Sequence, residues 1–278
     1  MWAAAPRQVS IALTNACDLH CPYCYAPKHS AQLDSEHLIP WLDELDAEGC
    51  LGVGFGGGEP TLHPDFTQVC RYAAGSTGLA VTLTTHAHRL DDRIAADLDG
   101  NVHFIRVSMD GVGETYQALR GRSFSNLIRR LHTVRRLAPF GINFVVNALT
   151  LPDLDAAVAL AADAGAAEFL LLPEQPVRGR VGIDERTIQG LRAWVNSYRG
   201  PIPLSVSEAG ADGLPTCDPL TEEAGLRAYA HIDASGMLKR YSYDEEGVPI
   251  GKEGVIQALK MLEIEKGATD EAVARVRL

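Results

Sequence analysis

The chain has 278 residues, 46% of them hydrophobic and 22% charged, a composition typical of globular proteins and unlike that of disordered ones. Its formal net charge of -11 argues against unaided binding to nucleic acid, because such binding depends mainly on Lys and Arg. No apolar run approaches the roughly 20 residues of a membrane span, and the first residues do not form a secretory signal, so we expect a cytoplasmic protein.

Segments rich in Val, Ile and Leu alternate with amphipathic segments over the first two thirds of the chain. The predicted strands are 9–14, 51–55, 79–85, 103–109, 142–149 and 168–173. The predicted helices are 34–48, 65–74, 91–98, 123–138 and 153–164. This alternation is typical of βα units around a parallel sheet, either an open doubly wound sheet or a partial barrel. In both architectures ligands bind at the carboxyl ends of the strands.

The pattern changes after about residue 178. Residues 184–200 predict one more helix, 201–208 a short strand, and 226–247 a hairpin that turns at Ser235 and Gly236. We expect a smaller α+β appendage here.

Three of the six cysteines lie within eight residues, directly after the first predicted strand: Cys17, Cys21 and Cys24. Zinc is one interpretation, since His20 is close, but a structural zinc site usually takes two pairs of ligands from separate segments and no second pair follows. A disulfide would leave one thiol over. Three thiolates suit an iron–sulfur cluster with one iron open to another ligand.

The segment CDLHCPYC resembles the CxxxCxxC signature of the radical S-adenosylmethionine (SAM) superfamily, with Tyr23 as the aromatic residue before the last cysteine. The resemblance implies that Cys17, Cys21 and Cys24 hold a 4Fe–4S cluster and that SAM binds its fourth iron. In this family an electron from the cluster cleaves SAM to methionine and a 5′-deoxyadenosyl radical, which abstracts hydrogen from a substrate.

The segment GGGEP, at the end of the second predicted strand, resembles the family motif that binds the amino group of SAM. Gly57 and Gly58 would let the backbone approach the ligand, and Glu59 can accept hydrogen bonds from an ammonium group. A glycine-rich turn before a helix is the simpler interpretation of the same residues.

The third predicted strand ends in TLTTHAH, where relatives often carry Thr-Thr-Asn-Gly; Thr85 matches and His86 replaces Asn. Asp18, after the first cysteine, also replaces a more usual Asn. We interpret His86 and His88 as a solvated loop pair rather than metal ligands, because no carboxylate partner is evident nearby.

The segment VSMDG resembles the family's Ser-Leu-Asp-Gly, which implies a SAM-binding role for Ser108 with Asp110 as a helper. YQALRGRSF resembles a stretch of the branch with SPASM and molybdenum-cofactor enzymes, where Arg120 would pair with the SAM carboxylate; a surface Arg closing a helix is the alternative. Asn147 and Leu172 match positions where relatives contact the ribose and adenine.

The carboxyl-terminal hairpin resembles the SPASM or twitch extension of relatives, but Tyr241 and Ser242 stand where a cysteine is expected. We therefore predict one cluster per chain. Cys217 is the single thiol after residue 70 and is either a hydrogen-atom donor to a substrate radical or an inert buried side chain. Cys50 and Cys70 are interpreted as core residues.

The resemblance covers about residues 7–180 and implies an α/β fold: a partial (β/α)6 TIM-type barrel (1–180) and a small α+β twitch-like extension (181–278). It predicts a radical SAM enzyme that epimerises, cross-links or rearranges a small natural product or a peptide. A low-potential electron donor such as flavodoxin or ferredoxin is expected, and no nucleic acid or membrane. Glu174 and Gln175 are either substrate contacts or solvated loop residues. A non-catalytic iron–sulfur or zinc redox or sensor module is the alternative.

Overall fold

The computed structural model describes residues 4–177, 179–207, 214 and 225–264. These residues form two compact units. The first comprises Met1–Ala16, Ala26–Val81 and Leu220–Leu278, and the second comprises Cys17–Tyr25 and Thr82–Pro219. Strand β3 (Ala80–Thr85) begins in the first unit and continues in the second.

The first unit contains a sheet in which β1 lies between β2 and β8. Its strand order is β10-β9-β8-β1-β2, with β1 parallel to both neighbours and β9 antiparallel to β8 and β10. The strands are β1 (Gln8–Thr14), β2 (Gly52–Gly57), β8 (Tyr229–Ile232), β9 (Met237–Lys239) and β10 (Val248–Pro249). The predicted carboxyl-terminal hairpin is confirmed, because β8 and β9 join through a turn at residues 233–236.

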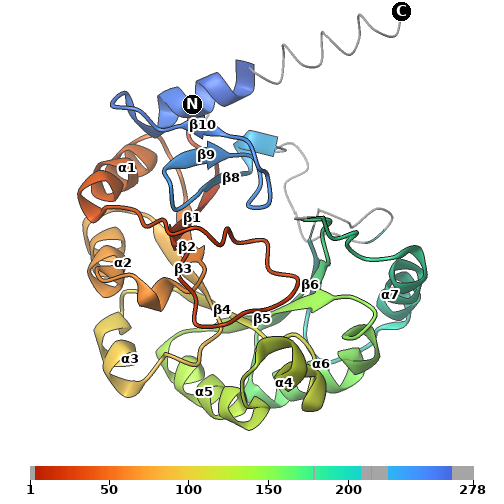
Figure 1. The fold of residues 1–278 in the computed structure, drawn as a ribbon. Coiled ribbons are helices and arrows are strands. Elements are labelled where there is room, and N and C mark those ends of the chain that lie inside the picture. Colours follow the sequence, from red (N-terminus) through yellow and green to blue (C-terminus); the bar gives the residue numbers. More distant parts are fainter. Residues whose placement is uncertain (1–3, 178, 208–213, 215–224, 265–278) are drawn as a thin grey trace, which may run out of the picture. The chain divides into compact units, whose positions relative to one another are not determined.

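Three helices support this sheet, and α1 and α2 lie side by side (Figure 1). They are α1 (Ser35–Ala47), α2 (Phe66–Ser76) and residues 254–264. A short 3-10 turn, η1 (Pro60–Leu62), precedes α2, and a second, η3 (Gly225–Arg227), precedes β8. Helix α1 begins where the Asp34 side chain accepts a hydrogen bond from the Glu36 N–H. The Glu44 carboxylate accepts hydrogen bonds from the backbone N–H of Val255 (2.6 Å) and Ile256 (3.2 Å), so the amino terminus of the last helix is capped by a side chain of α1.

The second unit is a parallel sheet in the order β3-β4-β5-β6-β7. Its further strands are β4 (Phe104–Ser108), β5 (Phe140–Val146), β6 (Glu168–Pro173) and β7 (Leu204–Val206). Its helices are α3 (Asp92–Leu98), α4 (Glu114–Arg120), α5 (Phe124–Leu137), α6 (Leu154–Ala164) and α7 (Glu185–Ser197), with the 3-10 turn η2 (Leu151–Asp153) before α6. Helix α5 packs against α3, α4 and α6, as Figure 1 also shows.

Alternation along β4 and β6 separates two faces of this sheet. Ile105, Val107, Phe169 and Leu171 are fully buried, whereas the residues between them are half-buried. All six predicted strands and all predicted helices are confirmed. Helix α4 was not expected, because it has seven residues and begins without a capping side chain.

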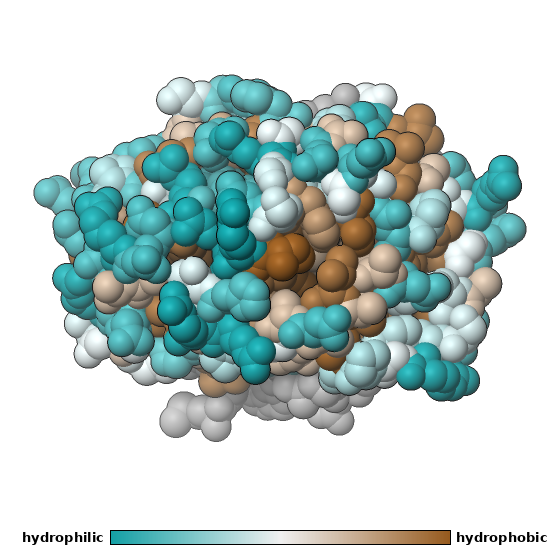
Figure 2. All heavy atoms as spheres, turned by 90° about the horizontal axis from the view of Figure 1, so that it is seen from below, coloured by the Kyte–Doolittle hydropathy of each residue, from teal (hydrophilic) through white to brown (hydrophobic). Residues whose placement is uncertain are grey.

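The part of the chain that the structure describes contains no helix of the length and hydropathy that crossing a membrane requires. On the face drawn in Figure 2 hydrophilic side chains predominate, and apolar ones gather near its centre.

Candidate functional site

The three clustered cysteines occupy one loop, residues 17–25, which follows β1 and belongs to the second unit. Cys21 is buried, and Cys17 and Cys24 pack half-buried against the same small apolar cluster. That cluster is formed by Leu19, Cys21, Tyr23 and Leu119, with Val145 at its edge. None of the three thiols is in a disulfide. Thiolates with an apolar surround are the ligand set that iron–sulfur clusters require, so the loop fits such a group.

Asp110 ties this loop to the sheet. Its carboxylate is 1% exposed and accepts hydrogen bonds from the Tyr23 hydroxyl (2.5 Å) and the Val145 N–H (2.7 Å), besides an ion pair with Arg120. Burial, together with the adjacent carboxylate, raises the pKa of Tyr23, which keeps the hydroxyl protonated as a donor. Asp110 therefore links the cysteine loop, β5 and α4.

Arg120 ends α4 but does not lie on the surface, since its side chain is 11% exposed. Its guanidinium pairs with Asp110, donates to the Cys21 sulfur (3.5 Å) and lies over the Tyr23 ring, 5.9 Å from its centroid. Burial alone would lower the pKa of Arg120, but the Asp110 carboxylate raises it, so the charge is retained. Its Nε is buried and has no hydrogen-bond partner among the described residues.

The GGGEP segment lies in the first unit, at the end of β2. The Gly58 N–H donates to the Thr14 carbonyl (2.7 Å), and the Glu59 N–H donates to the Ala16 carbonyl (2.8 Å). A Cβ on Gly57 would collide with the Thr14 carbonyl, and one on Gly58 with that of Ala16. Packing against the residues that precede the cysteine loop therefore already requires these glycines. Glu59 is fully buried, and its carboxylate accepts from the Thr61 hydroxyl (2.7 Å).

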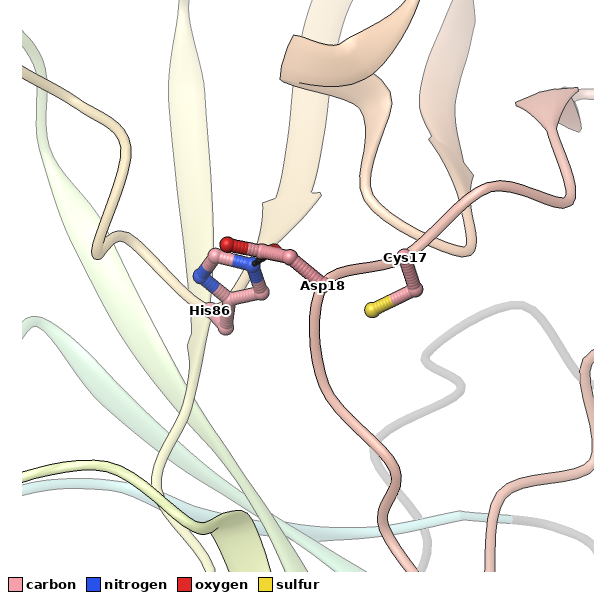
Figure 3. A group of neighbouring side chains, drawn as sticks. All are labelled: Cys17, Asp18 and His86. Carbon is pink, nitrogen blue, oxygen red and sulfur yellow. Dashed lines mark hydrogen bonds and ion pairs between the residues drawn. The ribbon is translucent and has the colours of Figure 1, made fainter.

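The prediction of a solvated pair at His86 and His88 is wrong. The His86 ring is 3% exposed and its Nε2 lies 2.8 Å from the Asp18 carboxylate, as the dashed line in Figure 3 shows. Asp18 is the carboxylate partner that was not evident in the sequence, because 68 residues separate it from His86. Ligand atoms of Cys17, Asp18 and His86 all lie within 4.8 Å of one another.

His88 is half-buried, and its Nε2 lies 2.8 Å from the Tyr116 hydroxyl. Burial lowers the pKa of His88 to about 4, with His86 as a further cause, so this ring is neutral at pH 7. Tyr116 is fully buried and had no signal of its own in the sequence.

The other predicted SAM contacts lie at or just beyond the ends of strands in the second unit. Thr85 is buried and accepts a hydrogen bond from the Ala87 N–H, and Ser108 is half-buried at the end of β4. Leu172 is half-buried in β6, in register with Val145.

Asn147 directly follows β5 and donates to the Glu174 carboxylate (2.8 Å). Glu174 is 7% exposed and also pairs with Arg180 (2.8 Å), so it is not a solvated loop residue. Gln175 is half-buried and donates to the carbonyl of Pro173 (2.9 Å). The sequence reasoning missed that Glu174 is held by partners on both sides.

The remaining cysteines divide into two cases. Cys50 and Cys70 are buried as predicted, and burial raises the pKa of Cys50 to about 11. Cys217 lies outside the described residues. Beyond β9, the rings of Tyr241 and Tyr243 stack with their centroids 5.5 Å apart.

Curated relatives resemble about half of the chain. It is 32% identical over 171 residues to "PqqA peptide cyclase" of Rhodopseudomonas palustris, covering 57% of this chain and 45% of that protein. It is 31% identical over 170 residues to "Mycofactocin maturase MftC" of Mycolicibacterium smegmatis, covering 58% and 43%. The chain therefore spans less than half the length of these relatives.

Solved structures match over more of the chain. Streptococcus suis SuiB bound to precursor peptide SuiA has a TM-score of 0.75 at 14% identity, covering 92% of this chain and 65% of that one. The enzyme anSMEcpe with bound AdoMet has a TM-score of 0.68 at 17% identity, covering 87% and 75%. These identities show the fold alone and confirm a partial TIM-type barrel with antiparallel strands in the carboxyl-terminal part.

The model of the "Radical SAM superfamily" matches residues 11–161, which is more than half of the chain. The match includes the cysteine loop, the GGGEP segment and Arg120. This chain belongs to the radical SAM superfamily.

Proposed function

We propose that this chain is an enzyme that reductively cleaves SAM at one 4Fe–4S cluster and uses the resulting radical to modify a peptide. The names of the relatives support a peptide substrate: a peptide cyclase, a maturase, and SuiB bound to its precursor peptide. A small substrate is the second candidate, since "GTP 3',8-cyclase" of Chlorobaculum tepidum is 32% identical over 126 residues.

One observation carries the proposal: three free thiols, those of Cys17, Cys21 and Cys24, share a single loop with an apolar surround. When bound there, the cluster supplies the electron that cleaves SAM. The apolar residues of the loop exclude water from the sulfurs, which matters because radical intermediates react with whatever reaches them.

Arg120 is the residue that we assign to the SAM carboxylate. Its charge is held in place by Asp110, and its Nε still has a hydrogen to donate. A planar guanidinium that keeps a free donor can bind a carboxylate without giving up its first partner. The remaining assignments are Gly57, Gly58 and Glu59 for the amino group, Tyr23, Asp110 and Ser108 for the methionyl part, and Thr85, Asn147 and Leu172 for the nucleoside.

For the carboxyl-terminal part we propose a twitch-like extension, residues 181–278, without an auxiliary cluster. Tyr241 and Ser242 occupy the positions where a ligand cysteine is expected, and a single Cys217 cannot hold a second cluster. Cys217 then remains as a hydrogen-atom donor. If the reaction inverts a stereocentre in deuterated solvent, Cys217→Ala removes deuterium from that position; equal incorporation in the variant contradicts the role.

Anaerobic reconstitution tests the central proposal. We expect about four irons per chain, and 5′-deoxyadenosine on addition of dithionite and SAM. Cys17→Ala, Cys21→Ala and Cys24→Ala each lose the iron, whereas Cys50→Ala, which removes a buried thiol outside the loop, retains it. Stoichiometric zinc without SAM cleavage contradicts the proposal and favours a redox or sensor module.

A further inference from the structure

We propose that Asp18 is held by His86 and Arg122 so that the start of the cysteine loop is fixed before the cluster binds. These three residues are called the Asp18 clamp. The inference rests on the proposed function, because that function places the cluster in this loop.

Two elements hold Asp18 from different sides. The His86 Nε2 lies 2.8 Å from one carboxylate oxygen, and the Arg122 guanidinium lies 3.0 Å from the other. The same guanidinium donates to the Asp18 carbonyl (3.2 Å), and Arg89 approaches the carboxylate to 4.0 Å. Both the side chain and the backbone of Asp18 are thus restrained by residues outside the cysteine loop.

The turn after β3 fixes the orientation of the His86 ring. The backbone N–H of His88 lies 3.1 Å from His86 Nδ1, and a backbone N–H can only donate. Nδ1 is therefore the acceptor, and the ring proton is on Nε2, which faces Asp18 (Figure 3). Ala87 holds this turn at a φ of 62°, a left-handed conformation that costs a non-glycine residue about 1–2 kcal/mol. The surrounding contacts maintain a strained turn whose product is an oriented donor.

The clamp gives the cysteine loop a second anchor. Tyr23, next to Cys24, is already tied to Asp110, and Asp18 is next to Cys17. Each of these outer cysteines therefore adjoins a residue that is restrained by the rest of the unit. A ligand set that is ordered in advance loses less conformational freedom when the metal binds, so the cluster is held more tightly.

Asp18 and His86 are also two positions at which the sequence departs from the residues that the family more usually carries. They contact each other although 68 residues separate them. The two departures are thus a single paired change, and substitutions at both should be coupled.

Iron loss from the reconstituted protein to a chelator tests the clamp. Asp18→Ala removes the acceptor, and His86→Phe keeps a ring but removes the donor. We expect each to accelerate iron loss about tenfold, the effect of one charge-assisted hydrogen bond. The double variant should lose iron no faster than the more affected single variant. Asp18→Asn retains an oxygen for His86 and should stay close to wild type.

Asp155→Ala is the matched control, because it breaks another 2.8 Å hydrogen bond to a ring nitrogen, that of Trp194, within the same unit. It should leave iron loss unchanged. Circular dichroism of the iron-free proteins checks folding, and His86→Phe carries the comparison if Asp18→Ala does not fold. The reduced cluster's electron paramagnetic resonance spectrum should shift in both clamp variants and not in the control.

The two proposals fail differently. If wild type retains about four irons but both single variants behave like it, or their effects multiply in the double variant, the clamp is wrong and the proposed function stands. If wild type binds zinc, for which Cys17, Asp18 and His86 offer three grouped ligands, both are wrong.

Discussion

Replacing Asp110 by Asn should destabilise the iron-free chain by about 3–5 kcal/mol, the cost of breaking a buried ion pair by removing one partner. The two side chains of this pair are 1% and 11% exposed, so water cannot take over for the lost charge. Asn has the shape of Asp but one acceptor oxygen. One oxygen of Asp110 accepts from Tyr23 and Arg120 and the other from Val145, so either orientation of the amide sets an N–H against an N–H.

Urea unfolding followed by circular dichroism at pH 7 measures this effect. Tyr23→Phe, which removes one donor to the same carboxylate, should cost less, about 1.5–3 kcal/mol. Asp110→Asn combined with Arg120→Met should recover most of the loss, because no unpaired charge then remains. A loss below about 1 kcal/mol for Asp110→Asn, or additive losses in the double variant, would refute the view that Asp110 organises the cysteine loop.

Two further predictions concern the first unit. Gly58→Ala should lower the unfolding free energy by about 1–3 kcal/mol, the usual cost of overpacking, because its Cβ would lie 2.6 Å from the Asn15 carbonyl oxygen; Gly75→Ala, with nothing within 4 Å, should have no such cost, and equal unfolding midpoints would contradict this. His231 is buried near Asp233 and Lys239, and burial lowers its pKa from 6.5 to about 4, so the unfolded chain binds a proton there that the folded chain does not. Stability should therefore be full above pH 6.5 and fall by up to about 3 kcal/mol as the pH drops to 4, and His231→Gln should flatten the profile; an unchanged slope rules this out.

The strands and helices could be predicted because their signals are local. Apolar periodicity located the six βα strands, and the three cysteines located the loop. Helix α4 escaped because seven residues between two glycines carry little periodicity.

The partners within the site could not be predicted, because they depend on contacts between distant segments. Nothing near His86 announces Asp18, and nothing near Arg120 tells whether it points to solvent or to Asp110. Ala87 also hides its conformation, since a positive φ is expected of Gly and not of Ala. Such local inconsistencies are typical of functional sites.

The position of β1 between β2 and β8 has a consequence for synthesis. Ser10 in β1 and Tyr229 in β8 are hydrogen-bonded at 2.6 Å but are 219 residues apart along the chain. At typical translation rates the ribosome needs roughly 10–45 s to cover that interval. During this time β1 can pair with β2 while its other edge, with unpaired N–H and C=O groups, stays open to pairing with other chains. We expect the nascent protein to depend on chaperones in this interval, and slower translation to lower its soluble yield.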